Sequence, residues 1–300
     1  KIIVTGGLGF IGAHTVVELI NNGFEVIIVD DLSNSELAVI ESIKHITGKK
    51  PYLEIFNLID YKKSDNFFKK HQDILGVIHF AAFKKVGQSV KNPLMYYKNN
   101  LQSLINVLEG MEKSNIPNIV FSSSCTVYGV PKKLPVSEES DFQQANNPYG
   151  NTKIQAEKKI IDYYNQFKNF NYSILRYFNP VGSHSSRIIG EDPIQNQSNL
   201  FPNILNVIMN EGKKLNVYGK NYSTKDGTPV RDYIHISDIA DGHIKSMNYL
   251  DNHGRNHVIN IGNSIKWGRR SRLPFSPINI APCSGRISLF GKLSSFLVAF

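Results

Sequence analysis

The chain has 300 residues, of which 41% are hydrophobic and 20% charged, and its formal net charge is +9. A chain of this length buries most of the surface that its unfolded form exposes, so one large or two smaller domains are expected, and disordered and collagen-like architectures are excluded. No apolar run approaches the roughly twenty residues that span a bilayer, and the opening KIIVTGG lacks the charged and apolar regions of a signal peptide, so we expect a cytoplasmic protein with no membrane partner.

Short β-branched runs alternate with helical stripes through the first 180 residues, a pattern typical of a parallel sheet covered by helices. The expected strands are Ile2–Thr5, Glu25–Val29, Tyr52–Phe56, Gly76–Phe80, Asn118–Ser122 and Tyr172–Tyr177. Val16, Leu19 and Ile20 form the apolar stripe of the first helix, and Gly23 suits the left-handed residue that ends it. Gly, Pro and Asn become denser from Phe178 onward. The chain is therefore predicted to form an α/β fold with a doubly wound parallel sheet and then to leave the sheet for a smaller cap.

A glycine-rich segment joins the first expected strand to the first helix. Gly6, Gly9 and Gly12 form the motif G-x-x-G-x-x-G, which permits a tight turn and lets the backbone approach a pyrophosphate at the positive end of the helix. An isolated motif of this kind is equally consistent with an ordinary strand-to-helix turn. Asp30, 18 residues after Gly12 at the end of the second strand, adds an acceptor for the adenosine ribose hydroxyls. Because Asp30 and Asp31 would repel a 2′-phosphate, the pattern favours NAD over NADP.

Tyr149 and Lys153 lie one turn apart at the start of a predicted helix, with Asn147 suited to the N-cap and Pro148 to the first position. A phenol has an ordinary pKa of about 10, so it acts as a base at neutral pH only when cations such as a lysine and an oxidised nicotinamide stabilise its anion. Such pairs also occur by chance on exposed helices. Ser122–Ser124 end a strand at the carboxyl edge of the sheet, where ligands of open α/β folds bind. Serine, tyrosine and lysine in this order behind a dinucleotide loop form a strong combined signal.

Cys125 follows these serines, but no residue near it in sequence supplies a base, so a buried structural thiol is favoured over a nucleophile. Cys125 and Cys283 show no C-x-x-C spacing, which argues against a disulfide framework and a structural zinc site. The nine histidines show no metal-ligand spacing either. We therefore expect no metal.

A resemblance to a known family rests on seven segments: VTGGLGFIGAHT, HFAAFKKVGQSV, FSSSCTVYG, NNPYGNTK, LRYFNPVG, GEDP and DGTPVRDYIHISDIADGH. They resemble the short-chain dehydrogenase/reductase superfamily and, within it, the UDP-glucose 4-epimerase family. The likeness runs nearly unbroken from Lys1 to about Gly262. It implies a Rossmann-type NAD-binding domain over residues 1–177, a partly interleaved UDP-sugar-binding domain over residues 178–262, and an isomerase of galactose metabolism.

The resemblance implies transient oxidation at C4 of the sugar. Tyr149 would take the proton of the 4-hydroxyl while C4 passes hydride to a permanently held NAD, and hydride returned to the opposite face of the 4-ketose would invert the centre. Ser124 would hydrogen-bond the reacting oxygen, and Lys153 would bind the nicotinamide ribose and lower the pKa of Tyr149. The implied substrates are UDP-galactose and UDP-glucose.

The resemblance also assigns a path for the cofactor. Its residues here are Gly6, Gly9, Phe10, Ile11, Gly12, Asp30, Asp31, Asn34, Ser35, Asn57, Leu58, Phe80, Ala81, Ala82, Lys84, Asn99, Tyr149, Lys153, Tyr177 and Phe178. Phe10 and Ile11 fall at the pyrophosphate, and Tyr177 and Phe178 beside the nicotinamide. Asn57 departs from the family, which commonly has an Asp facing the adenine amino group. Because the Asn carbonyl still accepts a hydrogen bond, a weaker contact is expected.

The implied substrate positions are Lys84, Ser124, Tyr149, Asn179, Asn199, Leu200, Asn216, Tyr218 and Arg231. Arg231 suits a diphosphate because a guanidinium pairs two oxygens at once. On the residues alone, Asn179 before Pro180 is typical of a turn, and Arg231 beside Asp232 is typical of a surface ion pair. Only the resemblance favours the binding roles.

Residues 263–300 do not match the family. They hold six basic residues and no acid, so they contribute +6 of the net charge of +9 and leave the other 262 residues at +3. The charge therefore does not indicate a nucleic-acid partner, since basic clusters interleaved with aromatic residues are absent from the first 262 residues. The change in composition is more typical of an altered reading frame or a retained intron than of a designed tail, and we expect an incomplete substrate cap. Lys1 opens without Met, so at least one residue is expected to be missing at the start.

Alternatives to an active epimerase stay open. An incomplete cap is consistent with an NAD-binding product that has no catalytic activity. Another nucleotide-sugar-modifying member of the superfamily is a lesser alternative, and a 4,6-dehydratase would need an acid pair where Cys125 and Thr126 stand. The predicted helices Ser89–Lys113 and Pro148–Phe167 are candidates for pairing two copies into a homodimer.

Overall fold

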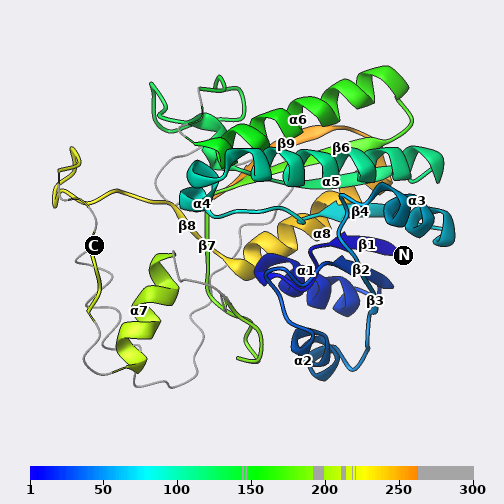
Figure 1. Ribbon diagram of the computed structural model, residues 1–300, viewed down its shortest axis with the longest axis horizontal. Helices are drawn as coiled ribbons and strands as arrows, with labels where there is room; N and C mark the ends of the chain where they lie inside the picture. Colours follow the sequence, from blue (N-terminus) through cyan, green and yellow to red (C-terminus); the bar gives the residue numbers. More distant parts are fainter. Residues whose placement is uncertain are drawn as a thin grey trace.

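The computed structural model describes residues 1–143, 145, 147–191, 199–210, 214–217, 219 and 221–262. They form a seven-stranded parallel sheet in the order β3-β2-β1-β4-β5-β6-β9, with helices on both faces (Figure 1). A second, two-stranded sheet pairs β7 with β8. The predicted α/β fold with a doubly wound parallel sheet is therefore confirmed. The predicted tail, residues 263–300, lies outside the described residues.

The bounds of the elements follow the predicted alternation of strands and helices. The strands are β1 (Ile2–Thr5), β2 (Val26–Asp30), β3 (Tyr52–Ile55), β4 (Gly76–His79), β5 (Asn118–Ser124), β6 (Asn171–Tyr177), β7 (Asn179–Val181), β8 (Tyr233–His235) and β9 (His257–Ile261). The helices are α1 (Phe10–Asn21), α2 (Ala38–Thr47), α3 (Tyr61–Lys70), α4 (Val86–Lys91), α5 (Pro93–Lys113), the 3-10 helix η1 (Cys125–Tyr128), α6 (Pro148–Phe167), α7 (Leu200–Met209) and α8 (Ile236–His253). Each of the six predicted strands is present, with ends that differ by at most two residues.

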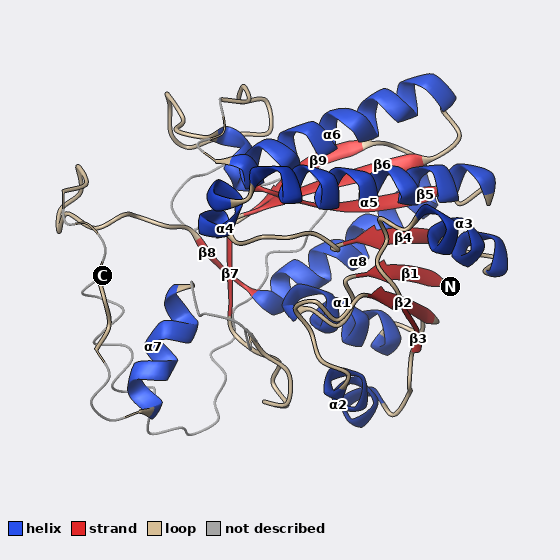
Figure 2. Cartoon of the chain, viewed as in Figure 1, coloured by secondary structure: helices blue, strands red, loops and turns tan. Residues whose placement is uncertain are grey.

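The strands divide their side chains between two cores because successive residues of a strand point to opposite faces. Val4 and Ile28 pack with apolar residues of α1, α2 and α8. Ile3 and Val77 pack with apolar residues of α3, α5 and α6. These three helices cover the other face of the sheet (Figure 2). Both faces are thus buried, which explains why β1 and β2, both interior strands of the sheet, are β-branched at nearly every position rather than at alternate ones.

The structure corrects one predicted helix. Instead of a single helix from Ser89 to Lys113, two helices, α4 and α5, meet at Asn92. Pro93 opens α5, and a proline disfavours helical backbone at the residue before it, so Asn92 has φ −133° and ψ 64°. The predicted end of α1 is confirmed, since Gly23 has φ +86°.

The parallel strands bring their carboxyl ends to one edge of the sheet, where functional residues are expected. Beyond this edge the chain builds β7, α7 and β8, and α7 stands apart from the main sheet (Figure 1). It then returns through α8, which packs against α1, and β9, which pairs with β6. Part of the second predicted domain therefore lies in the first. Among the described residues, no helix is long and apolar enough to cross a bilayer.

Candidate functional site

The glycine-rich loop passes so close to other backbone that it excludes larger side chains. A Cβ at Gly6, where φ is +68°, would lie 2.9 Å from Ala81 N, and a Cβ at Gly12 would lie 2.2 Å from Gly6 O. Helix α1 begins after Gly9 with no side-chain cap and no acidic residue in its first turn. Its first N–H groups and the positive end of its dipole are therefore suited to the pyrophosphate of a dinucleotide. The close backbone approach at Gly6 and Gly12 and the uncapped start of α1 therefore fit the pyrophosphate of NAD.

Asp30 ends β2 and anchors the loop on one side of this helix. Its Oδ2 accepts a hydrogen bond from Leu8 N at 3.0 Å, and its Oδ1 accepts from Ser35 Oγ at 2.7 Å and Leu32 N at 3.0 Å. The carboxylate is thus buried and fixed in orientation between the glycine loop and the segment after β2. A carboxylate held in this way presents its remaining lone pairs in a defined direction.

The predicted adenine contact, Asn57, lies beside Asp31. Its Nδ2 donates to Asp31 Oδ2 at 2.9 Å, and its Oδ1 accepts from Ile59 N at 3.0 Å. The side chain of Leu58 is buried in the core shared with α3 and α5, so only its backbone is available to a ligand. Asn34 is exposed after β2.

The segment after β4 is held by side chains from three other elements. Ala81 N donates to Thr5 Oγ1 at 3.3 Å, and the ring of Phe80 lies 4.6 Å from that of His243. Asn100 accepts from Phe83 N at 2.8 Å and donates to Phe83 O at 3.0 Å. Ala82 is half-buried in this segment. Sequence reasoning missed Asn100, although a polar residue on the buried stripe of α5, next to the predicted Asn99, was a usable signal.

Tyr149 and Lys153 project from the first turns of α6 toward the carboxyl end of β5. Asn147 caps the helix as predicted, since its Oδ1 accepts from Gly150 N at 2.8 Å, and Pro148 occupies the first turn. Lys153 is 5% exposed, and its Nζ donates to Ser122 O at 2.6 Å. The same ammonium lies 6.0 Å from the centre of the Tyr149 ring.

Burial shifts the pKa values of this pair in opposite directions. It raises the pKa of Tyr149, and a hydrogen bond from Ser124 only partly opposes the rise. It lowers the pKa of Lys153 to about 8, against the attraction of Glu157. At neutral pH the pair is therefore a neutral phenol beside an ammonium, and added positive charge at this edge would favour proton loss from the phenol.

Ser124 is the last residue of β5, and its hydroxyl accepts from Thr126 N at 3.3 Å. Burial raises the pKa of the neighbouring Cys125 to about 11, which leaves the thiol protonated, as expected for a structural cysteine. The charge of Arg231 opposes that rise, so the guanidinium lies near Cys125. The structure thus brings Arg231 to the side of the site that Ser124 lines.

Tyr177 ends β6 and hydrogen-bonds Ser122 through its hydroxyl. It is buried in the core under α1 and α8, and burial raises its pKa to about 12. Phe178 is half-buried, and its N–H donates to Ile261 O at 3.3 Å. Both residues therefore lie beside β5 and β9, at the edge of the sheet toward which the Tyr149 side chain projects.

The predicted substrate residues are less constrained. Asn179 opens β7, and its N and Nδ2 donate to Asp232 O at 3.0 and 2.7 Å. Leu200 and Arg231 are exposed, as is Asn216. Tyr218 lies outside the described residues.

Glu191 joins two predicted positions that lie on different elements. Its Oε1 accepts from Lys84 Nζ at 3.3 Å and from Asn199 Nδ2 at 2.5 Å. Sequence reasoning did not assign it, because its partner Lys84 is 107 residues away. The GEDP segment was the available signal.

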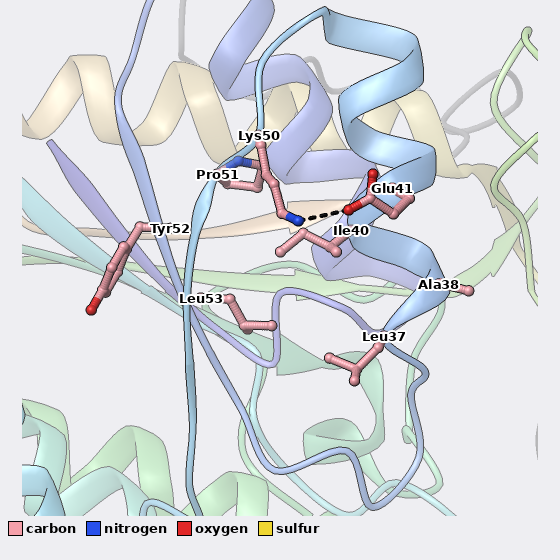
Figure 3. Close-up of a pocket in the computed structure, with 8 residues that line it drawn as sticks. All are labelled: Leu37, Ala38, Ile40, Glu41, Lys50, Pro51, Tyr52 and Leu53. Atoms are coloured by element: carbon pink, nitrogen blue, oxygen red, sulfur yellow. Dashed lines mark hydrogen bonds and ion pairs between the residues drawn. The ribbon is translucent and has the colours of Figure 1, made fainter.

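A groove of about 720 Å³ lies elsewhere, between α2 and β3 (Figure 3). Leu37, Ile40 and Leu53 line it, and the ion pair between Lys50 Nζ and Glu41 Oε1, 2.6 Å, bridges it. It contains none of the predicted site residues. Among the described residues, no cluster of His, Cys, Asp or Glu is arranged to hold a metal ion.

The model of the NAD dependent epimerase/dehydratase family matches residues 2–262. The chain is 44% identical over 261 residues to the UDP-glucose 4-epimerase of Bacillus subtilis, covering 87% of this chain and 76% of that protein. It is 49% identical over 260 residues to the bifunctional protein GAL10 of Pachysolen tannophilus, covering 85% of this chain but only 37% of that protein. The crystal structure of the Bifidobacterium longum UDP-glucose 4-epimerase, in complex with NAD+ and UDP, superposes with a TM-score of 0.82 at 42% identity, covering 87% of this chain and 77% of that chain.

These likenesses confirm the predicted resemblance and extend along the same residues, to position 262. The predicted cofactor, NAD, is the one in the family's name, and the loop geometry fits it. The chain belongs to the NAD dependent epimerase/dehydratase family.

Proposed function

We propose that the chain interconverts UDP-galactose and UDP-glucose, with Tyr149 as the base at the sugar 4-hydroxyl. The observation that carries the proposal is the position of Lys153, whose buried ammonium lies 6.0 Å from the Tyr149 ring beside the end of β5. Relatives at 44% identity are named UDP-glucose 4-epimerase, and similar structures were solved with NAD and UDP or a UDP-sugar. Both kinds of evidence support the same reaction.

NAD, held at the glycine loop and Asp30, would supply reversible hydride transfer at C4 of the sugar, with return to the opposite face, and a positive charge near the phenol. Tyr149 takes the hydroxyl proton and later gives it back. Its pKa is raised by burial, so the charge of Lys153 is needed to make the phenolate accessible. Ser124 orients the reacting oxygen by a hydrogen bond, since its hydroxyl lies next to Tyr149.

Inversion requires the sugar to turn within the site while the nucleotide stays bound. We assign this anchoring to Arg231, Asn179 and Lys84, with Asn199, Leu200, Asn216 and Tyr218 toward the uridine. Arg231 supports the assignment because its charge lies near Cys125, one residue from Ser124. A diphosphate bound there would place the attached sugar at the carboxyl edge of the sheet, beside Tyr149.

The cofactor contacts proposed are those of the glycine loop, Asp30 and the segment after β4. Asp30 supports NAD rather than NADP, because its fixed carboxylate would repel a 2′-phosphate. Pairing of two copies through α5 and α6, and a cytoplasmic location, stay predictions.

The test is incubation of the whole chain with UDP-galactose, followed by the sugar anomeric NMR signals. UDP-glucose should appear without consumption of added NAD. The variant Tyr149→Phe should retain NAD and lower the rate by about 10²- to 10⁴-fold, the usual contribution of a general base. Failure to form product when both NAD and UDP bind would overturn the proposal.

A second function, NAD binding without turnover, is favoured by the exposure of Leu200, Asn216 and Arg231. Thermal unfolding separates the two. If NAD raises the unfolding midpoint and UDP does not, the chain binds the cofactor alone. Tight UDP binding would count against this alternative.

A further inference from the structure

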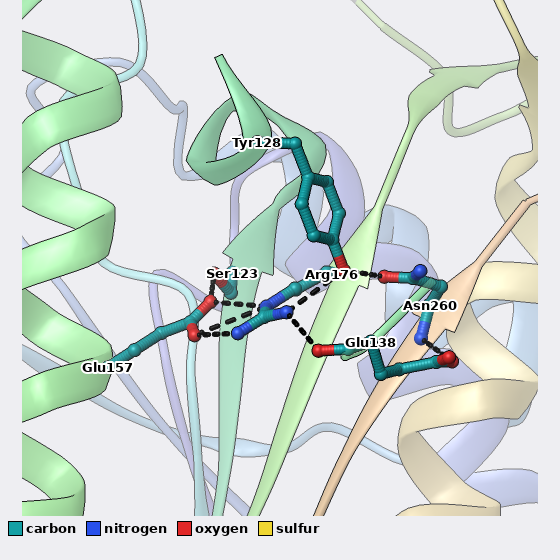
Figure 4. Close-up of polar contacts among 6 residues, drawn as sticks. All are labelled: Ser123, Tyr128, Glu138, Glu157, Arg176 and Asn260. Carbon is teal, nitrogen blue, oxygen red and sulfur yellow. Dashed lines mark hydrogen bonds and ion pairs between the residues drawn. The ribbon is translucent and has the colours of Figure 1, made fainter. Parts of the chain in front are cut away.

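A buried ionic network joins α6 to β5 and β6 (Figure 4). Glu157 on α6 is 0% exposed and Arg176 on β6 is 4% exposed. Arg176 Nη2 donates to Glu157 Oε2 at 2.6 Å and its Nε donates to Oε1 at 3.0 Å, while Ser123 Oγ donates to Oε1. With the second bond of Nε, to Oε2 at 3.2 Å, the carboxylate accepts four hydrogen bonds from two strands. None of these residues was assigned a role from the sequence.

Glu157 lies one further turn along the face of α6 that carries the catalytic pair. Tyr149, Lys153 and Glu157 follow at intervals of four residues, so they form one stripe that descends from the sheet edge. Ser123 and Arg176 are register partners across β5 and β6, and they directly precede Ser124 and Tyr177. The Glu157 carboxylate therefore holds α6 against the residues next to Ser124 and Tyr177.

We propose that Glu157 is a positioning residue for the reaction: its carboxylate, fixed by Arg176 and Ser123, keeps Lys153 charged and sets the first turns of α6 against the end of β5. The consequence for turnover rests on the proposed epimerase function. The effect on the pKa of Lys153 does not rest on that function, since it depends only on residues of this chain.

The charges around Lys153 support an electrostatic role. Burial and the charge of Lys153 lower the pKa of His79 on β4 to about 3, so this ring is neutral. Burial raises the pKa of Tyr96 on α5 and of Tyr177 on β6, so both stay neutral phenols, as does Tyr149. Cys125 stays a neutral thiol. Among these neighbours only Glu157 is negative, and its attraction opposes the effect of burial on Lys153.

Arg176 pairs with the carboxylate and couples it to the rest of the sheet edge. Its Nη1 donates to Tyr128 OH at 2.9 Å and to Glu138 O at 3.3 Å, and its guanidinium lies 4.9 Å from the centre of the Phe142 ring. Tyr128 OH in turn donates to Asn260 Oδ1 at 2.6 Å. A buried carboxylate with a bidentate arginine and a hydroxyl donor is well compensated, whereas loss of one partner would leave a buried charge unpaired.

The decisive measurement is the proton affinity of Lys153 in the whole chain, which requires no turnover. In protein labelled with 13C at lysine Cε, the signal lost in Lys153→Met identifies the residue, and its titration midpoint is expected near pH 8. Glu157→Gln should lower that midpoint by about one unit or more, a tenfold weaker affinity for the proton. The exposed pair partner Glu41 supplies the control: Glu41→Gln should leave the midpoint unchanged.

Turnover gives the second readout. In Glu157→Gln the alkaline limb of the kcat profile should move to lower pH by the same shift, with KM little changed. Glu157→Asp keeps the charge and should keep the limb, with a reduced kcat. Ser123→Ala removes only the link to β5, so it should reduce kcat without moving the limb or the lysine midpoint.

The proposal is overturned if folded Glu157→Gln keeps the midpoint of Lys153. If that variant does not fold, the same substitution is made in an Arg176→Gln background, where no buried arginine is left unpaired. Glu157→Gln should still lower the midpoint of Lys153 relative to Arg176→Gln alone, and an unchanged midpoint there would overturn the proposal equally. A chain that shows the shift but no epimerase activity would remove the proposed function and leave the electrostatic role of Glu157 standing.

Discussion

The two halves of the site differ in how far the fold itself holds them. On the cofactor side, Asp30 accepts three hydrogen bonds from surrounding loops, and Lys153 is 5% exposed. On the substrate side, Leu200 and Arg231 are exposed on segments beyond the sheet. The difference teaches that the parallel sheet fixes the residues proposed for the chemistry and the cofactor, whereas those proposed for the nucleotide sugar lie on segments beyond the sheet. Substitutions on the first side should therefore change stability, and substitutions on the second only ligand affinity.

Acid should unfold the cofactor side before the substrate side, because three buried histidines lie in or against the main sheet. Burial lowers the pKa of His14 and His243 to about 4 and that of His79 to about 3. Each ring binds a proton more readily in the unfolded chain than in the folded one. The folded state is therefore at its most stable, with respect to these groups, above pH 6.5 and loses stability as the pH falls toward 4. The loss is on the order of 3 kcal/mol for each histidine.

Urea unfolding between pH 4.5 and 7 checks this expectation. His243→Gln should reduce the slope of unfolding free energy against pH by about 1.4 kcal/mol per unit. His253→Gln, at the exposed end of the same helix, is the control and should leave the slope unchanged. An unchanged slope in His243→Gln would contradict the lowered pKa of His243 in the folded state.

A substitution in the glycine loop should have a smaller effect on the cofactor side. Gly12→Ala places a Cβ 2.2 Å from Gly6 O, so the turn must shift, which should cost about 1–3 kcal/mol of stability. NAD affinity, measured by calorimetry, should fall about tenfold or more, since the N–H groups of α1 move with the turn. Gly87→Ala in α4, where a Cβ would meet nothing within 4 Å, is the matched control. Equal NAD affinity in the two variants would be inconsistent with a pyrophosphate at this loop.

The contrast also explains what could be predicted from the sequence. Gly6, Gly12, Asp30, Tyr149 and Lys153 belong to short patterns whose spacing encodes their geometry, and the structure puts them at the predicted ends of strands and helices. The other residues that shape the site do so through distant partners.

Two examples show the limit. Glu157 bonds to Arg176 across 19 positions and to Ser123 across 34, so no local motif announces the network, although a carboxylate on the buried face of a helix is a usable warning. The break at Asn92 was readable from Pro93, because a proline disfavours helical backbone at the residue before it. Strand β9 was missed because it follows α8, long after the regular alternation had faded.

Arg231→Ala sharpens the comparison from the substrate side. Loss of a charge-assisted contact to a diphosphate should raise the Kd for UDP about tenfold, while NAD affinity and the unfolding midpoint stay constant. Arg255→Ala, exposed after α8, is the control for loss of one positive charge. A parallel loss of NAD affinity would mean that Arg231 stabilises the sheet edge itself.

Glu191 is where the two halves meet, and its removal should have the smallest effect. Its carboxylate accepts hydrogen bonds from Lys84 Nζ and Asn199 Nδ2, and the Lys84 side chain is 46% exposed, so the ion pair is worth up to about 1 kcal/mol. Glu191→Gln removes the charge that competes with a diphosphate for Lys84. The affinity for UDP should therefore rise about two- to fivefold at low salt, with an unchanged unfolding midpoint.

Isothermal calorimetry with UDP measures this change, and Glu41→Gln, which breaks the exposed pair with Lys50 on α2, controls for the loss of one negative charge. A fall in UDP affinity would have a different meaning. Glu191 would then be a strut that orients Lys84 and Asn199 together for the nucleotide. In that case the substrate half would be organised in advance by a single carboxylate, despite the exposure of its other residues.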